Sequence, residues 1–224
     1  MKNFSVAKAL IFDMDGVIVE SERPKFLFLK KVFNDFKIQL EDDQFQKLVG
    51  RSVLTFLAEY LQKPTLEDKI WQIFQKDYLE RITEYVSPIQ PIVEFIKEYE
   101  GPIQIGIASS GIQKINEKMA RHFGIIENVS IIVSREAVDK LKPAPDLYLK
   151  AAELLNVNPV DCIAIEDTII GAQSALGAKM RCFIFLNGYN KKEKFINLDI
   201  SGFIKNKKDV KDIITANIKT YKYD

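Results

Sequence analysis

Two aspartates follow an apolar run near the beginning of the chain. Residues 9–12 read Ala-Leu-Ile-Phe, and Asp13, Met14, Asp15 and Gly16 come next. An apolar run without polar alternation is typical of a buried parallel strand, and ligands of open α/β sheets bind beyond the carboxyl ends of such strands. We therefore expect Asp13 and Asp15 to do chemistry, with Gly16 turning the chain away. The alternative is an Asp-Gly turn that only ends the strand.

Three later segments carry polar groups at comparable places. Residues 104–108 are followed by Ser109, Ser110 and Gly111, residues 141–146 hold Lys142 just before a helix, and residues 162–165 are followed by Glu166, Asp167 and Thr168. Enzymatic phosphoryl transfer requires a nucleophile, cations around the equatorial oxygens of the phosphoryl group, and a proton donor for the leaving group. The four segments together contain residue types suited to each of these parts.

The serine and lysine segments are candidates for binding phosphate. Ser109 precedes a predicted helix, where its hydroxyl and the backbone N–H groups of Ser110 and Gly111 would form an anion site. Lys142 can place a point charge on a phosphate and can also neutralise Asp13. Each has a simpler interpretation, which is a helix N-cap for Ser109 or Ser110 and a surface position for Lys142.

Glu166 and Asp167 would add carboxylates to the same edge of the sheet. Carboxylates that converge without a cation repel one another strongly, so the sequence implies a hard divalent metal with oxygen ligands, and Mg²⁺ fits best. Asp13 and Asp167 are the expected side-chain ligands. The alternative for Glu166 and Asp167 is a plain helix N-terminus, where the helix dipole favours acids.

Taken in order, the four segments resemble the haloacid dehalogenase superfamily of phosphohydrolases over roughly residues 8–190. The runs Asp-Met-Asp-Gly-Val, Lys-Pro-Ala-Pro-Asp and Glu-Asp-Thr are similar to the branch that holds β-phosphoglucomutases and phosphoglycolate-type phosphatases. The resemblance implies that Asp13 is the nucleophile and that Asp15 is the general acid and later the general base. It also implies that Asp15 gives its backbone carbonyl to the metal, and that Glu166 is a metal ligand or a partner of the ligands.

Two departures from family patterns narrow the expected function. Haloalkanoate dehalogenases and phosphonate-cleaving members of the superfamily lack the second aspartate, so Asp15 argues against both activities. The β-phosphoglucomutases carry a histidine where this chain has Lys25 and an arginine where it has Val53. We therefore expect a phosphatase that acts on a small phosphorylated metabolite through an aspartyl phosphate. The alternatives are a sugar-phosphate mutase and a non-catalytic binding protein, and the intact catalytic set argues against the latter.

The rest of the sequence predicts how these segments are positioned. Residues 22–83 have helical periodicity without a strand pattern, whereas strands and helices alternate after Pro88. We expect a doubly wound α/β parallel sheet, formed by residues 1–16 and 86–224, with an inserted all-α cap at residues 17–85. The expected elements are strand 8–13, helix 89–99, strand 103–108, helix 112–123, strand 129–133, helix 145–155, strand 162–166, helix 169–178 and strand 181–186. The tail at 203–218 has apolar residues at helical spacing, which are Val210, Ile213, Ile214 and Ile218.

Three cations of the predicted cap are candidates for substrate contacts. They are Lys25, Arg51 and Arg81, and each of them has the alternative of being a solvated helix charge. On the core side, Ser110 and Gly111 are the expected substrate-binding residues. The sequence does not name the substrate, because cap contacts determine it.

The composition limits the partners and the compartment. The chain has 224 residues, 47% of them apolar, and a formal net charge of +1, so nothing attracts it broadly to nucleic acid or to an anionic membrane. Residues 1–6 are too short and polar for a secretory signal, and no apolar run approaches about 20 residues. We expect a cytoplasmic monomer in which Cys162 and Cys182 are packed thiols. Zinc is not expected, and the single histidine, His122, should have a packing or surface position.

Overall fold

The computed structural model describes residues 6–218, and the chain divides into two compact units. The larger unit comprises residues up to 19 together with residues from 88 onward, and the smaller unit comprises residues 20–87. The two passages of chain between the units pair as a short two-stranded sheet of β2 (Val19–Glu20) and β3 (Ser87–Pro88). Each unit has its own buried side chains, and we describe them separately.

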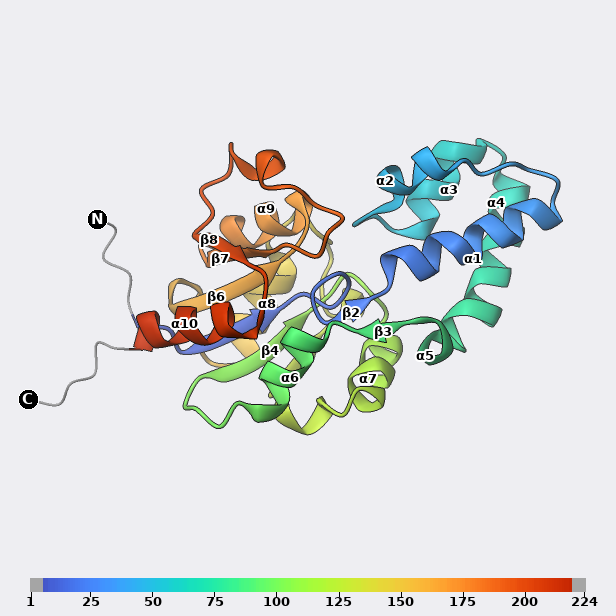
Figure 1. Cartoon of the computed structure of the whole chain (residues 1–224). Coiled ribbons are helices and arrows are strands. Elements are labelled where there is room, and N and C mark those ends of the chain that lie inside the picture. The colour runs from blue at the N-terminus through green and yellow to red at the C-terminus, as the bar shows by residue number, and fades with distance from the viewer. Residues whose placement is uncertain (1–5, 219–224) are drawn as a thin grey trace, which may run out of the picture. The chain divides into compact units, whose positions relative to one another are not determined.

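Six strands form a sheet in the larger unit, and every neighbouring pair is parallel (Figure 1). The strands are β1 (Ala9–Phe12), β4 (Gln104–Ala108), β5 (Ile131–Val133), β6 (Cys162–Glu166), β7 (Arg181–Phe185) and β8 (Gly202–Ile204). Their order across the sheet is β5-β4-β1-β6-β7-β8. The order therefore reverses at β1, and open α/β sheets bind ligands at the carboxyl edge beside such a reversal.

The register places the ends of three strands side by side. Phe12, the last residue of β1, lies opposite Ile107 of β4 and Ile165 of β6. The backbone N–H of Asp13 then donates to the carbonyl oxygen of Ile165 at 2.9 Å. Asp13 therefore lies opposite Glu166, the last residue of β6, and opposite Ala108, the last residue of β4. Ser109 is the next residue along the chain after Ala108.

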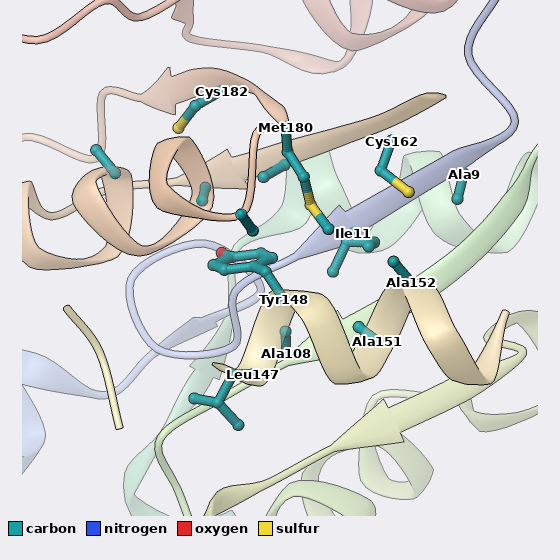
Figure 2. Close-up of a cluster of buried hydrophobic side chains, with 14 of the residues drawn as sticks. Ala9, Ile11, Ala108, Leu147, Tyr148, Ala151, Ala152, Cys162, Met180 and Cys182 are labelled. Carbon is teal, nitrogen blue, oxygen red and sulfur yellow. The ribbon is translucent and has the colours of Figure 1, made fainter. Parts of the chain in front are cut away.

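Helices cover both faces of the sheet, as expected for a doubly wound fold. Successive side chains of a strand point to opposite faces. Ala9 and Ile11 join a buried cluster with α8 (Asp146–Leu154) and α9 (Ile169–Gly177), which includes Tyr148 of α8 (Figure 2). Phe12 points the other way, and its ring centroid lies 6.2 Å from that of Phe95 in α6 (Gln90–Glu98). The helices of this unit are α6 (Gln90–Glu98), α7 (Gln113–His122), α8 (Asp146–Leu154), α9 (Ile169–Gly177) and α10 (Lys207–Ile218). The predicted α/β core is confirmed.

The smaller unit consists mainly of helices, which are joined by short irregular segments. It contains α1 (Glu22–Asp35), α2 (Phe45–Leu48), α3 (Val53–Leu61), α4 (Pro64–Ile73), a π-helical segment (Phe74–Leu79) and α5 (Ile82–Tyr85). Ser52 accepts a hydrogen bond from the N–H of Thr55 at the start of α3, and Pro64 begins α4, where a missing N–H costs nothing. An all-helical insert was expected from the sequence.

The π-helical segment explains a sequence pattern that an α-helix would not keep on one face. Ile70, Phe74, Tyr78 and Ile82 recur every four residues, and all four are buried. Residues four apart drift around an α-helix with 3.6 residues per turn, whereas the wider π turn returns them to the same side. Phe74 and Tyr78 stack with 4.7 Å between ring centroids, so the buried aromatic face continues through the segment.

The tail at 203–218 is helical only from Lys207 onward, and this part contains the residues with helical spacing. Residues Gly202–Ile204 form β8, which pairs with β7, and α10 begins at Lys207. A three-residue edge strand is too short to show an alternating pattern. The helix start has its own signal, because Asp209 accepts from the N–H of Lys205 at 2.7 Å and Asn206 accepts from the N–H of Asp209 at 3.1 Å.

Several other expectations have clear outcomes in the structure. Cys162 and Cys182 are free and buried, and burial raises the pKa of Cys162 to about 12, so both are packed thiols as predicted. His122 is exposed near the end of α7. The prediction that residues 1–6 are not a secretory signal concerns residues that, apart from Val6, lie outside the described part of the chain. Residues 1–5 and 219–224 of the predicted core also lie outside it. The division into a catalytic core and a cap at residues 17–85 stays a prediction.

Within residues 6–218, no helix combines the length and the apolar character needed to cross a lipid bilayer.

Candidate active site

Lys142 is the centre of a buried group of charges at the end of β1. Its ammonium nitrogen lies 2.6 Å from Asp13 Oδ1 and 2.6 Å from Glu166 Oε1, and it donates to the carbonyl oxygen of Ala108 at 2.9 Å. The side chains are 5% exposed for Lys142, 11% for Asp13 and 0% for Glu166. A charge this far from water requires partners of opposite sign. One cation thus joins two acids from neighbouring strands.

The loop that carries Lys142 is held from the adjacent helix. The Ser174 hydroxyl of α9 donates to the carbonyl oxygen of Ala144 at 2.6 Å, and the N–H of Ala144 donates to the carbonyl oxygen of Leu141 at 3.0 Å. Helix α8 then begins at Asp146, directly after Pro145. These contacts fix the loop on both sides of the lysine, so its side chain enters the site from a defined direction.

Glu166 contacts protein donors through both of its carboxylate oxygens. Oε1 accepts from Lys142 and from the Tyr148 hydroxyl, each at 2.6 Å, and Oε2 accepts from the N–H of Asp167 at 3.2 Å. The ring of Tyr148 also faces the ammonium of Lys142, which lies 5.0 Å from the ring centroid. Tyr148 is fully buried, and it therefore supports both the acid and the lysine.

Burial dominates the electrostatics of this group. It raises the pKa of Asp13 to about 8, against the opposing charge of Lys142 and with Glu166 and Asp15 adding to the increase. Burial alone would lower the pKa of Lys142, but Asp13 and Glu166 outweigh it and raise the pKa, so the lysine stays charged. Burial and the neighbouring Glu166 raise the pKa of Tyr148, which keeps its hydroxyl a donor. A bound cation would lower the pKa of Asp13.

Asp13, Glu166 and Asp167 form an acidic cluster that fits a divalent cation. One carboxylate oxygen from each residue lies within 4.8 Å of the other two, and all three residues are buried. Mg²⁺ prefers such oxygen ligands and needs few carboxylates. The turn after β1 leaves space for the cluster only because residue 16 is glycine: it has a φ of +79°, and a Cβ atom there would lie 2.1 Å from Asp167 Oδ2. The donor set and its surroundings therefore suit a hard cation.

A second glycine, Gly171, leaves room for the carboxylate of Glu166 in the same way. A Cβ atom at Gly171, in the first turn of α9, would lie 1.9 Å from Glu166 Oε2. Thr168 caps this helix by accepting from the N–H of Gly171 at 3.1 Å. The amino end of α9 can therefore approach the carboxylate of Glu166 closely.

Ser109 is fully buried at the end of β4 and belongs to a polar network. Its hydroxyl oxygen accepts from the N–H of Gly111 at 3.0 Å and lies 3.4 Å from Asn116 Oδ1, while Asn116 Nδ2 donates to Ser134 Oγ at 2.7 Å. The helix N-cap interpretation is wrong for both Ser109 and Ser110, because the N-cap residue of α7 is Ile112. Ser109 instead shapes the loop that leads into the helix.

Asp15 lies in a tight turn two residues after Asp13. The N–H of Gly16 donates to the carbonyl oxygen of Val19 at 2.8 Å, and the N–H of Val19 donates to that of Met14 at 2.9 Å. The turn keeps both aspartates near the carboxyl edge of the sheet. The structure thus brings together Asp13, Lys142, Glu166 and Asp167, with Ser109 and Asp15 on adjoining segments, while the roles assigned to them stay predictions.

The candidate substrate-binding cations Lys25 and Arg51 lie in the smaller unit, and each has an acidic partner there. Lys25 pairs with the buried Glu22 at 2.8 Å, and the lysine side chain is 12% exposed. Arg51 pairs with Glu59 at 2.6 Å on the surface. Arg81, the third cation, bonds with Glu84. These partners reduce the net positive charge that any of the three could offer to a phosphate.

Three polar side chains around the cluster were missed by the sequence analysis. Tyr148 contacts Glu166 as described. Asn187, just beyond β7, donates through Nδ2 to Asp167 Oδ2 at 2.8 Å, and Asn190 donates through Nδ2 to the carbonyl oxygen of Asp167 at 2.7 Å. Asn187 had a recognisable signal, since it is a polar residue at the end of an apolar strand run, like Asp13 and Ser109. Tyr148 had only a phenol within a buried helix face.

Comparison with known proteins finds a matching hydrolase family and related sugar-phosphate enzymes. A model of the haloacid dehalogenase-like hydrolase family matches residues 10–185. The β-phosphoglucomutase of Bacillus subtilis is 31% identical over 184 residues, which cover 77% of this chain and 80% of that protein. Fructose-1-phosphate phosphatase YqaB of Escherichia coli is 26% identical over 175 residues, which cover 76% of this chain and 92% of that protein.

Solved structures agree with the fold. The crystal structure of CbbY from Rhodobacter sphaeroides in complex with phosphate superimposes with a TM-score of 0.78 at 22% identity, over 91% of this chain and 96% of that one. At this identity the likeness concerns the fold alone.

Proposed function

The chain belongs to the haloacid dehalogenase-like hydrolase family, and we propose that it is a Mg²⁺-dependent phosphatase acting on a small phosphate monoester through an aspartyl phosphate. The observation that carries the proposal is the position of Lys142, which bridges Asp13 and Glu166 at the point where the strand order reverses. A cation held against a buried carboxylate can bind a phosphoryl group while the carboxylate attacks it.

In this proposal Asp13 is the nucleophile. One of its carboxylate oxygens forms a bond to phosphorus as the bond from phosphorus to the alcohol oxygen breaks, which gives an aspartyl phosphate. Asp15 donates its proton to the departing alcohol oxygen and later removes a proton from the water that attacks phosphorus. Hydrolysis of the acyl phosphate then restores the Asp13 carboxylate and releases inorganic phosphate.

Lys142 and Ser109 bind the phosphoryl oxygens in the same proposal. The ammonium of Lys142 offsets the charge of Asp13 and of the incoming phosphate. Mg²⁺ would be held by Asp13 and Asp167 with the backbone carbonyl of Asp15, and when bound it supplies Lewis-acid stabilisation of the charge on the phosphoryl oxygens. Glu166 fixes Lys142 through Oε1, which accepts from Lys142 and from Tyr148, and its Oε2 keeps acceptor capacity beside the acidic cluster, where Glu166 would be a ligand of the metal or a partner of the ligands.

A sugar-phosphate mutase is the second candidate, favoured by the 31% identity to a β-phosphoglucomutase. A mutase must keep water away from the aspartyl phosphate until a bisphosphate sugar takes the phosphoryl group back. This chain has Lys25 and Val53 where those mutases have a histidine and an arginine, and Lys25 is paired with Glu22 at 2.8 Å. We therefore place the mutase second.

We expect the purified protein to hydrolyse p-nitrophenyl phosphate in the presence of Mg²⁺. Exhaustive chelation should lower the hydrolysis rate by at least about 100-fold. The physical reason is that Asp13, Glu166 and Asp167 would otherwise repel the phosphate. Restoring Mg²⁺ is the control, since it should recover the rate. Full activity after chelation would contradict the metal assignment.

The same preparation also separates the two candidates. With β-glucose 1-phosphate and a bisphosphate activator, a phosphatase yields free phosphate or no reaction, whereas a mutase yields glucose 6-phosphate. Rapid glucose 6-phosphate formation with negligible phosphate release would replace the phosphatase proposal by the mutase.

A further inference from the structure

Asn187 ties together two parts of the candidate metal site. Its amide nitrogen Nδ2 donates to Asp167 Oδ2 at 2.8 Å and to the carbonyl oxygen of Gly16 at 3.0 Å, and its Oδ1 accepts from the N–H of Tyr189 at 3.0 Å. Both acceptors of Nδ2 can only accept and the partner of Oδ1 can only donate, so the orientation of the amide is determined. An asparagine at this position uses all of its polar atoms.

The contact with Gly16 places Asn187 between two acids from different strands. Gly16 is in the turn that follows Asp13 and Asp15, and Asp167 follows β6. The two segments are close already, since a Cβ atom at residue 16 would lie 2.1 Å from Asp167 Oδ2. The amide of Asn187 bonds to the backbone of one segment and to the side chain of the other, and so fixes the rotation of the Asp167 carboxylate relative to the β1 turn.

The loop that carries Asn187 is itself anchored to Asp167. Asn190 donates through Nδ2 to the carbonyl oxygen of Asp167 at 2.7 Å and to that of Phe185 at 2.9 Å. The loop therefore contacts both the backbone and the side chain of one acidic residue. Because the loop is already anchored, the hydrogen bond from Asn187 to the Asp167 carboxylate forms with little further loss of conformational entropy of the Asn187 side chain.

We infer that Asn187 is a positioning residue for the Mg²⁺ site, acting through Asp167, an inference that rests on the proposed function. A partner that orients a metal-binding carboxylate influences metal affinity by about 10–100-fold. Asn187 does not need to touch substrate for this effect. Its removal should weaken Mg²⁺ binding and leave the chemical step itself largely intact once the metal is saturating.

The test is calorimetric titration of MgCl₂ into chelator-treated wild type, Asn187→Ala and a control variant, without substrate. The control is Asn158→Ala, which removes an asparagine that accepts from the N–H of Val160 at 3.3 Å before β6, at the opposite edge of the sheet. We expect a Mg²⁺ Kd raised about 10-fold or more in Asn187→Ala and unchanged in Asn158→Ala. The kcat of Asn187→Ala at saturating Mg²⁺ should return to within about threefold of wild type.

The outcomes separate this inference from the proposed function. A purely structural role would lower the thermal stability of Asn187→Ala while the Mg²⁺ Kd stays within about twofold of wild type, and that result would overturn the inference alone. A wild-type protein that neither binds Mg²⁺ nor hydrolyses phosphate esters would overturn both. If Asn187→Ala does not fold, Asn187→Ser gives the same test, because its hydroxyl is too short to bridge Asp167 and Gly16.

Discussion

Asp13→Asn is expected to lower phosphate-ester hydrolysis by at least about 10³-fold while the protein stays folded. Asparagine has the shape of aspartate, and its amide oxygen can accept the hydrogen bond that Lys142 makes with Asp13 Oδ1 at 2.6 Å. That oxygen is nevertheless a poor nucleophile, so the phosphoryl group should not be transferred to the protein. The measurement is kcat with p-nitrophenyl phosphate at saturating Mg²⁺, with circular dichroism to verify folding.

A matched control for this variant is Asp161→Asn. Asp161 is another buried aspartate, 9% exposed, and it pairs with Lys8 at 3.3 Å just before β6 begins. It lies at the amino edge of the sheet, away from the candidate site, so its substitution should leave kcat within about twofold of wild type. Turnover by Asp13→Asn above about one hundredth of the wild-type value would remove Asp13 from the nucleophile position.

Lys142→Met should abolish detectable activity and lower the free energy of unfolding by about 3–5 kcal/mol, because it leaves two buried carboxylates without their shared cation. Lys142 is 5% exposed and lies 2.6 Å from both Asp13 and Glu166. Methionine has a similar length and no charge, so the loss is mainly electrostatic. Urea unfolding in the presence of chelator measures the effect on stability without compensation by Mg²⁺.

Two further variants separate the loss of charge balance from a general packing effect. Lys150→Met removes a partly exposed lysine of α8 that pairs with Glu153 at 2.8 Å, and its effect on the free energy of unfolding should stay within about 0.5 kcal/mol. The double variant Lys142→Met with Glu166→Gln also removes the negative charge of Glu166, which the single variant leaves without a cation. It should recover part of the lost free energy of unfolding, but no activity. A single Lys142→Met variant as stable as wild type would contradict the electrostatic account of the site.

The sequence was sufficient for the α/β core and for the residues that meet at its carboxyl edge. The strands β1, β4 and β6 are adjacent and parallel. The polar residues that follow them therefore lie side by side at the carboxyl edge of the sheet. This alignment brings Asp13, Glu166 and Asp167 together as expected, and Lys142 reaches them from the loop before α8. The local signal was strongest at Asp13, because an apolar strand, two aspartates and a glycine follow one another within a few residues.

Two of the remaining features depend on contacts between segments that are distant in the sequence. Nothing near Asn187 indicates that its amide reaches Gly16, 171 positions earlier in the chain, and nothing near Tyr148 indicates that its hydroxyl reaches Glu166. The pairing of Lys25 with Glu22 was also missed, although a lysine three residues after a glutamate on a helix is a recognisable ion-pair spacing. Edge strand β8 was too short to show any pattern.

The most direct measurement of the central claim is the early time course of p-nitrophenol release by Asp15→Asn with saturating Mg²⁺. p-Nitrophenolate leaves without a proton from Asp15, but water still needs a base to attack the aspartyl phosphate. We therefore predict a burst of about one p-nitrophenol per active site, followed by slow turnover, with the phosphoryl group on Asp13 after an acid quench. A linear time course without a burst, and no phosphoryl group on Asp13, would contradict a phosphatase that works through an aspartyl phosphate.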